Sequence, residues 1–201
     1  RGQNLREALH TWSSLSDEAD ALYRVLNVFL HVCDAVAFAH SRGVVHRDIK
    51  PENVMVGSFG EVYLVDWGVA SLIPATGQED PVSVSSERHT RSGVRGTPAF
   101  MAPEQAKGVL TEIGERTAIF GLGALLYFIL TGHPPFEGSS ASEILTRARA
   151  GLYPDPEQSE RGQRAPALCR IVRKAMAPTP DERHATVLAL EEEVRGFLNV
   201  G

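Results

Sequence analysis

The sequence predicts a mainly helical fold that contains one small β-hairpin, and three observations lead to this prediction. Apolar residues recur with helical spacing over several stretches, of which residues 18–41 are the longest. Two short β-branched runs, residues 54–56 and 62–65, flank the turn-forming sequence GSFG, as in a hairpin. The chain has 201 residues, of which 43% are hydrophobic, so it is long enough for one large domain or two small ones.

The first half of the chain begins with a short predicted helix at residues 4–9. A long helix follows over residues 18–41, where apolar side chains form a stripe with helical spacing. Gly43 suits the end of this helix, because glycine readily adopts the left-handed backbone conformation that commonly follows a helix. The hairpin comes next.

The second half begins with a polar, turn-rich stretch, residues 69–95, which we expect to be mobile. Residues 118–132 carry no charge, but this run of 15 residues is shorter than the roughly 20 that a membrane-spanning helix needs. We therefore predict a buried central helix over residues 118–131 and no membrane-spanning segment. Further helices, interrupted by a polar loop at 151–165, are predicted at residues 142–150, 167–177 and 185–198.

Composition and charge argue against some classes of function. A net charge of −5 is unusual for a nucleic-acid-binding protein, which is commonly basic. Cys33 and Cys169 lie far apart, each within a helical pattern, which favours buried thiols in a reducing compartment such as the cytoplasm. The chain opens with Arg1 and shows no signal peptide, so we expect a fragment of a longer protein.

Residues 44–68 carry the chemistry. Asp48 is followed five residues later by Asn53, and Asp66 comes directly after the second strand of the hairpin. Because the two outer ends of an antiparallel hairpin lie side by side, we expect Asn53 and Asp66 to meet there. An amide oxygen and a carboxylate suit Mg²⁺ carrying nucleotide phosphates. Asp48 would accept a proton from an attacking hydroxyl, and Lys50 would offset charge on the phosphoryl group that moves.

The stretch HRDIKPEN, residues 46–53, and the sequence DWG, residues 66–68, resemble the catalytic and metal-binding loops of eukaryotic-type (Hanks-type) serine/threonine protein kinases. Lys50, followed by Pro and Glu, is typical of the serine/threonine branch, and the later helices resemble bacterial members. The resemblance implies transfer of the γ-phosphate of ATP, with Mg²⁺, to serine or threonine hydroxyls of a protein substrate. Trp67 replaces the usual Phe before Gly68 but keeps a large apolar ring.

The resemblance also implies roles for residues outside these two loops. Met55 would form the floor of the adenine pocket. Residues 66–104 would be the activation segment, in which a phosphate on Thr90 or Ser92 pairs with Arg47, next to His46. In the sequence GTPAFMAPE, Thr97 would hydrogen-bond Asp48 and Lys50. Glu104 would form a buried ion pair with Arg183.

The resemblance covers residues 1–201 as the C-terminal lobe of a kinase domain. The small lobe of the family, with its glycine-rich loop and phosphate-binding lysine, is not recognisable: none of Lys50, Lys107 and Lys174, the three lysines, is placed for that role. We expect the isolated chain to be inactive, to need the missing lobe as its partner, and to self-associate through the face exposed without it.

Two departures from the family pattern keep a second interpretation open. Ala118 replaces the Asp that accepts hydrogen bonds from the backbone around His46 and Arg47, and Phe128 replaces a Glu that attracts basic substrate residues. The alternative is therefore a pseudokinase or scaffold module without catalysis. A small-molecule phosphotransferase of kinase-like fold is a third interpretation, which the presence of GTPAFMAPE opposes.

Overall fold

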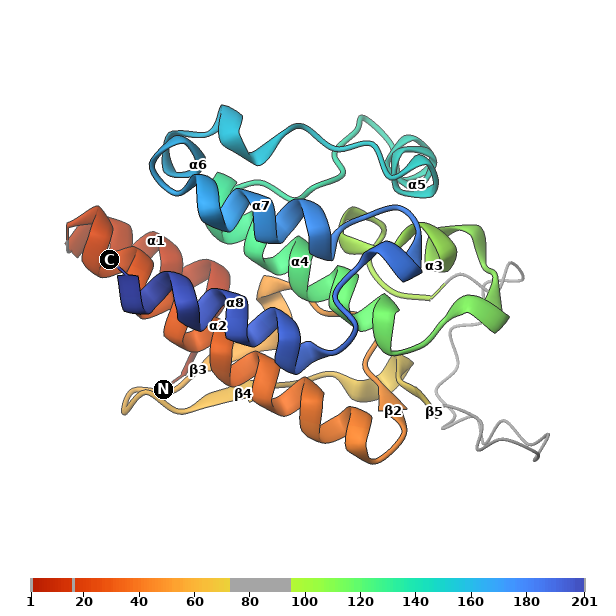
Figure 1. The fold of residues 1–201 in the computed structure, drawn as a ribbon, viewed down its shortest axis with the longest axis horizontal. Helices are drawn as coiled ribbons and strands as arrows, with labels where there is room; N and C mark the ends of the chain where they lie inside the picture. The colour runs from red at the N-terminus through yellow and green to blue at the C-terminus, as the bar shows by residue number, and fades with distance from the viewer. Residues whose placement is uncertain (1, 16, 73–94, 201) are drawn as a thin grey trace.

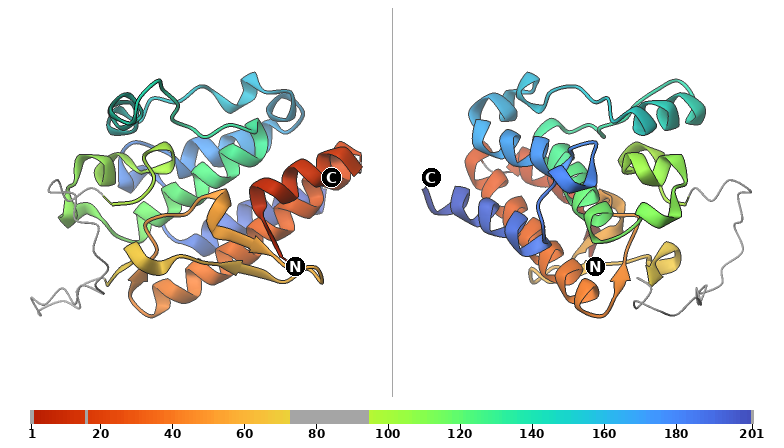
Figure 2. Two further views of the ribbon diagram at one scale, coloured as in Figure 1. Left: turned by 180° about the vertical axis from the view of Figure 1, so that it is seen from behind. Right: turned by 45° about the vertical axis from the view of Figure 1, so that its right-hand side comes forward.

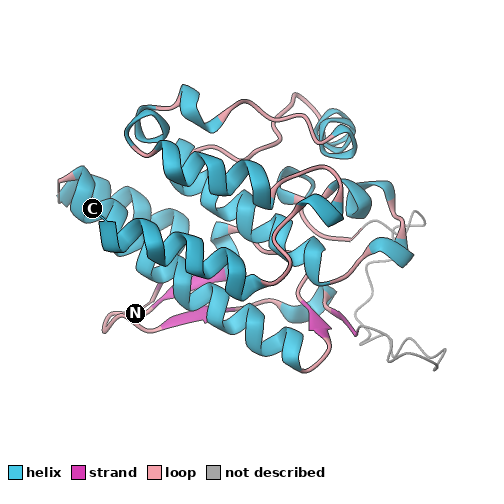
Figure 3. Ribbon diagram, in the orientation of Figure 1, coloured by secondary structure: helices cyan, strands magenta, loops and turns pink. Residues whose placement is uncertain are grey.

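A computed structural model of the chain describes residues 2–15, 17–72 and 95–200. This part of the chain contains eight α-helices, whose arrangement is drawn in Figure 1. The strands are short and lie along one edge of the molecule (Figure 3). The predicted mainly helical fold is confirmed. The helices are α1 (Leu5–Leu15), α2 (Glu18–Ser41), α3 (Pro103–Lys107), α4 (Glu115–Thr131), α5 (Ala141–Ala150), α6 (Glu160–Arg164), α7 (Pro166–Ala175) and α8 (Val187–Val200).

Helix α4 is the centre of the fold. Every residue from Thr117 to Leu130 is buried, as expected for a helix that is apolar on all sides. Helices α2 and α8 pack together on one side of it, and α7 packs along the other (Figure 1). The core made by these helices supports the segments that follow α2, which carry the chemistry.

Two small antiparallel sheets flank this core. Strands β3 (Val54–Val56) and β4 (Val62–Leu64) form the predicted hairpin, in which Met55 pairs with Tyr63. A third strand, β1 (Gln3–Asn4), adds to the other edge of β3, so the sheet order is β1-β3-β4. Seen from behind in Figure 2, this sheet lies against α2. Strand β2 (Val44–Val45) pairs with β5 (Ser71–Leu72), so the segments before residue 46 and after residue 70 lie side by side.

The helix ends follow local chemistry. The side chain of Asp17 accepts the backbone N–H of Asp20 at 2.9 Å and caps α2. Helices α4 and α5 end at Gly132 and Gly151, whose φ angles are 74° and 64°. Glycine adopts this left-handed conformation without the steric cost that a Cβ would bring. Gly43 likewise has a φ of 70°, directly after the cap residue Arg42 of α2.

Several element predictions need correction. Residues 151–165 are not simply a polar loop: they contain α6, capped by Ser159, whose Oγ accepts the N–H of Gly162. The central helix begins at Glu115, three residues before the predicted start. The helical region predicted over residues 142–198 runs over 141–200, because α5 starts one residue earlier and α8 spans Val187–Val200. Strand β1 and helix α3 are too short to produce a periodic pattern.

The membrane prediction meets one contrary observation. By length and composition alone, Ala19–Ser41 of α2 could cross a bilayer, a test that the core helices of soluble proteins also pass. In this structure α2 contributes Phe29, Val32 and Val36 to the helical core, and none of the three is exposed to solvent.

Replacing Gly123 of α4 by Ala should destabilise the fold. A Cβ at this position would lie 2.7 Å from Cγ of Met176 and 2.8 Å from Cβ of Ala175, where α4 and α7 meet. Overpacking of this kind costs about 1–3 kcal/mol. The matched control is Gly196→Ala in α8, where a Cβ meets no atom within 4 Å and helix propensity improves by about 1 kcal/mol. Urea denaturation should move the two midpoints in opposite directions, and a shared direction would contradict the packing argument.

Candidate active site

The candidate site lies on the loop between β2 and β3. Arg47 has a φ of 67° and Asp66 a φ of 63°, and these are the non-glycine residues with positive φ in the described part of the chain. Such left-handed conformations are costly for residues with a Cβ and concentrate at functional sites. Both strained positions therefore fall within the two motifs that the sequence analysis selects.

Asp48, Lys50 and Thr97 form one hydrogen-bonded cluster. Lys50 Nζ donates to Asp48 Oδ2 at 2.7 Å and to Thr97 Oγ1 at 2.7 Å. The backbone N–H of Thr97 donates to Asp48 Oδ1 at 2.8 Å. The structure thus brings together three predicted residues, one of which lies 49 positions beyond Asp48. The contact between Thr97 and Asp48 runs through the backbone N–H of Thr97, whereas its hydroxyl contacts the lysine.

The orientation of the Asn53 side chain is fixed by hydrogen bonds to Asp48 of the same cluster. Its Nδ2 donates to the carbonyl of Asp48 at 2.8 Å and to Asp48 Oδ2 at 3.2 Å. Both of these bonds use the amide nitrogen, so Oδ1 is the atom that remains for a cation. Asn53 is buried, and its carbonyl accepts the N–H of Val65 at 2.8 Å, which closes the open end of the hairpin.

Asp66 directly follows this closed end and is exposed. No hydrogen bond between the side chains of Asn53 and Asp66 occurs in the described residues. The charges of Asp48 and Asp66 both oppose the lowering of the pKa of His46 by burial, so each carboxylate lies within electrostatic range of this ring. Met55 is half-buried on β3, and Gly68 lies in a helical turn after Asp66.

His46 and Trp67 connect the two motifs. Their rings meet edge to face with centroids 4.5 Å apart, and Trp67 Nε1 donates to the carbonyl of Leu64 at 2.9 Å. His46 Nε2 lies 3.0 Å from the carbonyl of Val65 and must donate to it. Nδ1 is then free to accept the N–H of Asp48 at 3.2 Å. A neutral His46 thereby binds a backbone N–H in the region where Ala118 removes the usual acceptor.

Gln105 is a positioning residue that the sequence analysis missed. Its Nε2 donates to the carbonyls of Arg47, at 2.5 Å, and Arg95, at 2.7 Å. Gly96, with a φ of 114°, permits this approach: a Cβ there would lie 2.8 Å from both the Arg47 carbonyl and Gln105 Nε2. Gln105 follows the APE motif directly in the sequence, and that position is the one signal that could have identified it.

The guanidinium of Arg47 is a second feature of this region. Arg47 is 8% exposed, and its Nε and one Nη have no hydrogen-bond partner among the described residues. Burial lowers the pKa of Arg47, and the charge of Arg95 lowers it further. A buried guanidinium with two such nitrogens, within electrostatic range of a second arginine, has the chemistry to bind an anion. Thr90 and Ser92, the predicted phosphorylation sites, lie outside the described residues.

Glu104 and Arg183 form a buried ion pair, as the sequence analysis expects. Two Arg183 nitrogens donate to the two carboxylate oxygens at 2.7 and 2.8 Å, and Thr117 donates to Glu104 Oε1 at 2.9 Å. Arg183 also donates to backbone carbonyls, and its guanidinium lies over the ring of Phe120 at 4.9 Å. The pair fastens α3 to α4 and to the segment before α8.

Phe128 is buried beneath the guanidinium of Arg6, whose carbon lies 4.5 Å from the ring centroid. Arg6 Nε donates to Glu52 of the catalytic loop at 2.6 Å. The carboxylate of Glu52 is therefore already paired with a cation from this chain. This arrangement agrees with the expectation that position 128 does not attract basic substrate residues.

Lowering the pH from 7.5 to 5.5 should destabilise the fold. Burial lowers the pKa of His40, His46 and His184 below the ordinary value of 6.5. In this window the unfolded chain binds more protons than the folded chain, so the free energy of unfolding rises with pH. It falls as the pH is lowered, because protonation of these buried histidines then favours the unfolded chain. Urea midpoints measured across the window should fall toward acid. A midpoint that stayed constant or rose would contradict the prediction.

Comparison with known proteins covers nearly the whole chain. A family model described as a protein kinase domain matches residues 1–194. The chain is 34% identical over 186 residues to the serine/threonine-protein kinase PknD of Protochlamydia amoebophila, covering 89% of this chain and 19% of that protein. It is 32% identical over 193 residues to PknB of Mycolicibacterium smegmatis, covering 96% of this chain and 28% of that protein. The chain therefore spans between about a fifth and somewhat more than a quarter of the length of these relatives.

Proposed function

This chain belongs to the protein kinase family, and from that premise we propose that it carries the phosphoryl-transfer site of a serine/threonine protein kinase. One observation carries the proposal. Lys50 Nζ donates to both Asp48 and Thr97, and Asp48 in turn accepts the N–H of Thr97 and the amide of Asn53. A base, a cation and a docking segment are thereby fixed to one another before any substrate arrives.

In this proposal Asp48 is the group that meets the substrate. Its carboxylate, held by three donors, accepts the proton of the attacking serine or threonine hydroxyl. Lys50 places positive charge beside the acceptor oxygen, while Thr97 fixes the segment on which the substrate lies. Because these groups are oriented in advance, they need no reorganisation when charge develops in the transition state.

The residues present fit Mg²⁺ and ATP. Asn53 leaves an amide oxygen free and Asp66 presents an exposed carboxylate, which are the hard oxygen donors that Mg²⁺ prefers. The described residues contain no group of three or more His, Cys, Asp or Glu that could hold a metal by themselves. Phosphate and water oxygens would complete the shell, as is usual for Mg²⁺. When bound, Mg·ATP supplies the γ-phosphoryl group and neutralises its charge; Met55 would lie under the adenine.

Activation by phosphorylation belongs to the same proposal. A phosphate on Thr90 or Ser92 would bring the anion that the buried guanidinium of Arg47 lacks. A phosphate bound to the side chain of Arg47 would act on a residue of the catalytic loop whose backbone carbonyl is already held by Gln105. A variant with Ala at both positions cannot carry this phosphate and should be less active than the phosphorylated natural protein.

The proposed partners are a protein substrate and a small lobe, which would supply the phosphate-binding lysine and cover the face that carries Met55 and Asp66. Left uncovered, that face would favour self-association. Cys33 and Cys169 are buried free thiols, which agrees with a reducing compartment, and we propose the cytoplasm.

The proposal is tested by incubating the full-length protein with γ-labelled ATP and a mixture of candidate protein substrates. Acid hydrolysis of the labelled products should release phosphoserine and phosphothreonine, and removal of Mg²⁺ with EDTA should abolish labelling. Label found in phosphotyrosine alone would overturn the serine/threonine assignment. Unchanged labelling in EDTA would overturn the metal assignment.

A further inference from the structure

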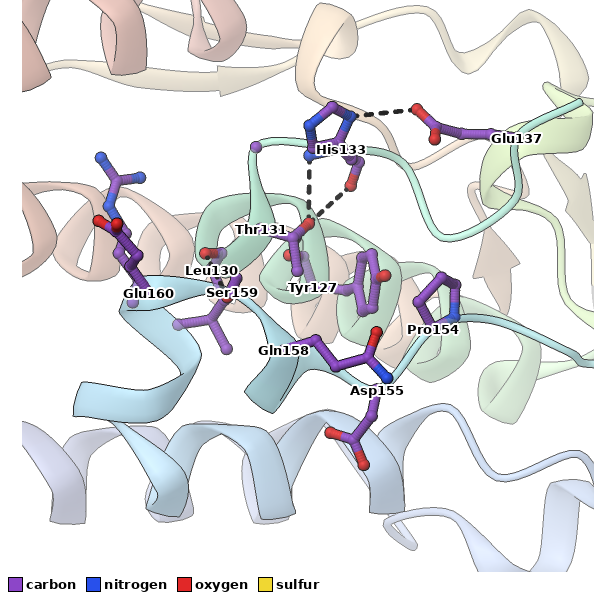
Figure 4. A pocket seen from close by; sticks show the side chains of 12 residues that line it. Tyr127, Leu130, Thr131, His133, Glu137, Pro154, Asp155, Gln158, Ser159 and Glu160 are labelled. Carbon is purple, nitrogen blue, oxygen red and sulfur yellow. Dashed lines mark hydrogen bonds and ion pairs between the residues drawn. The ribbon is translucent and has the colours of Figure 1, made fainter.

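A cavity of about 650 Å³ lies away from the catalytic loop, at the C-terminal end of α4. It is bounded by the last turn of α4, by the loop that carries His133 and Glu137, and by the segment from Pro154 to Arg161 (Figure 4). A cavity of this size is within the range that proteins use to bind small molecules or side chains.

Tyr127 is the buried polar group in this cavity. The residue is 3% exposed, and its ring packs edge to face on Tyr153 with centroids 5.6 Å apart. Its hydroxyl has no hydrogen-bond partner among the described residues, and the oxygen is accessible from the cavity rather than enclosed. Figure 4 shows this ring beside Pro154 and Gln158 in the cavity. Burial, together with the charge of Glu137, raises the pKa of Tyr127 to about 12, so the hydroxyl stays protonated and can donate or accept.

Most of the other polar groups around the cavity already have partners. Thr131 Oγ1 donates to a backbone carbonyl and accepts the N–H of His133, and Ser159 Oγ donates to a backbone carbonyl. Arg161 Nη1 donates to the carbonyl of Ile129, and Asp155 is held by Arg173. In the described part of the chain, the side chains of Gln158 and Glu160 make no hydrogen bond. Glu137 uses one oxygen, Oε1, for His133 at 3.2 Å. The groups that remain available are therefore one phenol, one amide and two carboxylates.

We propose that this cavity is a docking site for a basic side chain, lysine or arginine, on a peptide segment of the protein substrate. A cation would bind the carboxylate of Glu137, and its stem would lie on Leu130 and Pro154. Glu160, which Figure 4 draws on the opposite side of Tyr127, would add negative charge at the other end of the cavity. The phenol oxygen would accept one of the hydrogen bonds of the cation.

The position of the cavity favours a protein substrate as the source of this cation. The N–H of Phe136, in the loop that borders the cavity, donates to the carbonyl of Ala99 at 3.3 Å. Ala99 lies two residues after Thr97, which contacts Asp48. A substrate bound in the cavity would thus contact a loop that is hydrogen-bonded to the segment carrying Thr97, next to the proposed site of the acceptor hydroxyl. This inference rests on the proposed kinase function for the identity of the partner, but not for the cation chemistry.

The experiment measures binding without catalysis. Fluorescence anisotropy of a labelled nine-residue peptide of alternating Lys and Ala is recorded with the full-length protein and no ATP, beside a peptide in which Gln replaces each Lys. The Lys peptide should bind and the Gln peptide should not. The double variant Glu137→Gln, Glu160→Gln should weaken binding by about tenfold or more, and Tyr127→Phe by a few-fold. Glu192→Gln, an exposed carboxylate on α8, makes the same type of charge change outside the cavity and should leave binding unchanged.

Each outcome decides the proposal. Equal weakening by Glu192→Gln would mean attraction to the overall negative charge and would overturn the site. Binding of free 1,5-diaminopentane without binding of the peptide would assign the cavity to a small amine and overturn the peptide docking site. Since no step of the measurement requires phosphoryl transfer, peptide binding can fail while the protein still labels substrates, and labelling can fail while the peptide binds.

Discussion

Asp48→Asn in the full-length protein is expected to lower the rate of phosphoryl transfer by about 10²- to 10⁴-fold. The amide has the same shape as the carboxylate, and its oxygen can still accept the N–H of Thr97, which lies 2.8 Å from Asp48 Oδ1 in the natural protein. It cannot accept a proton from the substrate hydroxyl, and it removes the charge that Lys50 pairs with at 2.7 Å. The rate of ATP-dependent labelling, measured at saturating ATP, reports the loss directly.

The control for this change is Asp181→Asn, the same substitution at a side chain that is 94% exposed. It should leave the rate unchanged, and both variants should unfold at the temperature of the natural protein within a few degrees. Equal labelling by the Asp48 variant and the natural protein would remove the catalytic role of Asp48. That result would favour the alternative of a pseudokinase or scaffold module.

The sequence predicted the parts of the site that depend on short motifs. Asp48, Lys50 and Asn53 lie within six residues, so their mutual contacts follow from one loop, and Thr97 was added through its family motif. Gln105 could not be predicted in this way. Its two bonds end on the carbonyls of Arg47 and Arg95, whose directions depend on a left-handed φ at Arg47 and a φ of 114° at Gly96. Backbone angles of this kind leave no periodic trace in a sequence.

The fold shows the same limit. Helices α2 and α4 have long apolar patterns and were predicted, whereas α6 has five residues, little more than one turn. Ser159, whose side chain caps α6, is a local signal for this helix in the sequence. Strand β1 has two residues, and its existence depends on pairing of Asn4 with Met55, a contact between distant parts of the chain. Elements that tertiary pairing creates cannot be found from local spacing.

Glu104→Ala is expected to lower the free energy of unfolding by about 3–5 kcal/mol. The substitution leaves the guanidinium of Arg183, whose side chain is 0% exposed, without the carboxylate that binds two of its nitrogens. It also removes the acceptor of the Thr117 hydroxyl. For a domain of this size the thermal midpoint should fall by about 6–20 °C. Differential scanning calorimetry measures both quantities.

Burial, rather than the presence of an ion pair, is the reason for this large effect. Arg147→Ala breaks a pair of similar length, 2.8 Å to Glu143, whose partners are half-exposed, and it should leave the thermal midpoint nearly unchanged. The double variant Glu104→Leu, Arg183→Met removes both buried charges together. It should be less destabilised than the sum of the two single variants, because neither partner is left as an uncompensated charge. Additive losses would mean that Glu104 and Arg183 act through separate packing contacts, and the ion pair would then not be what joins α3 to the segment before α8.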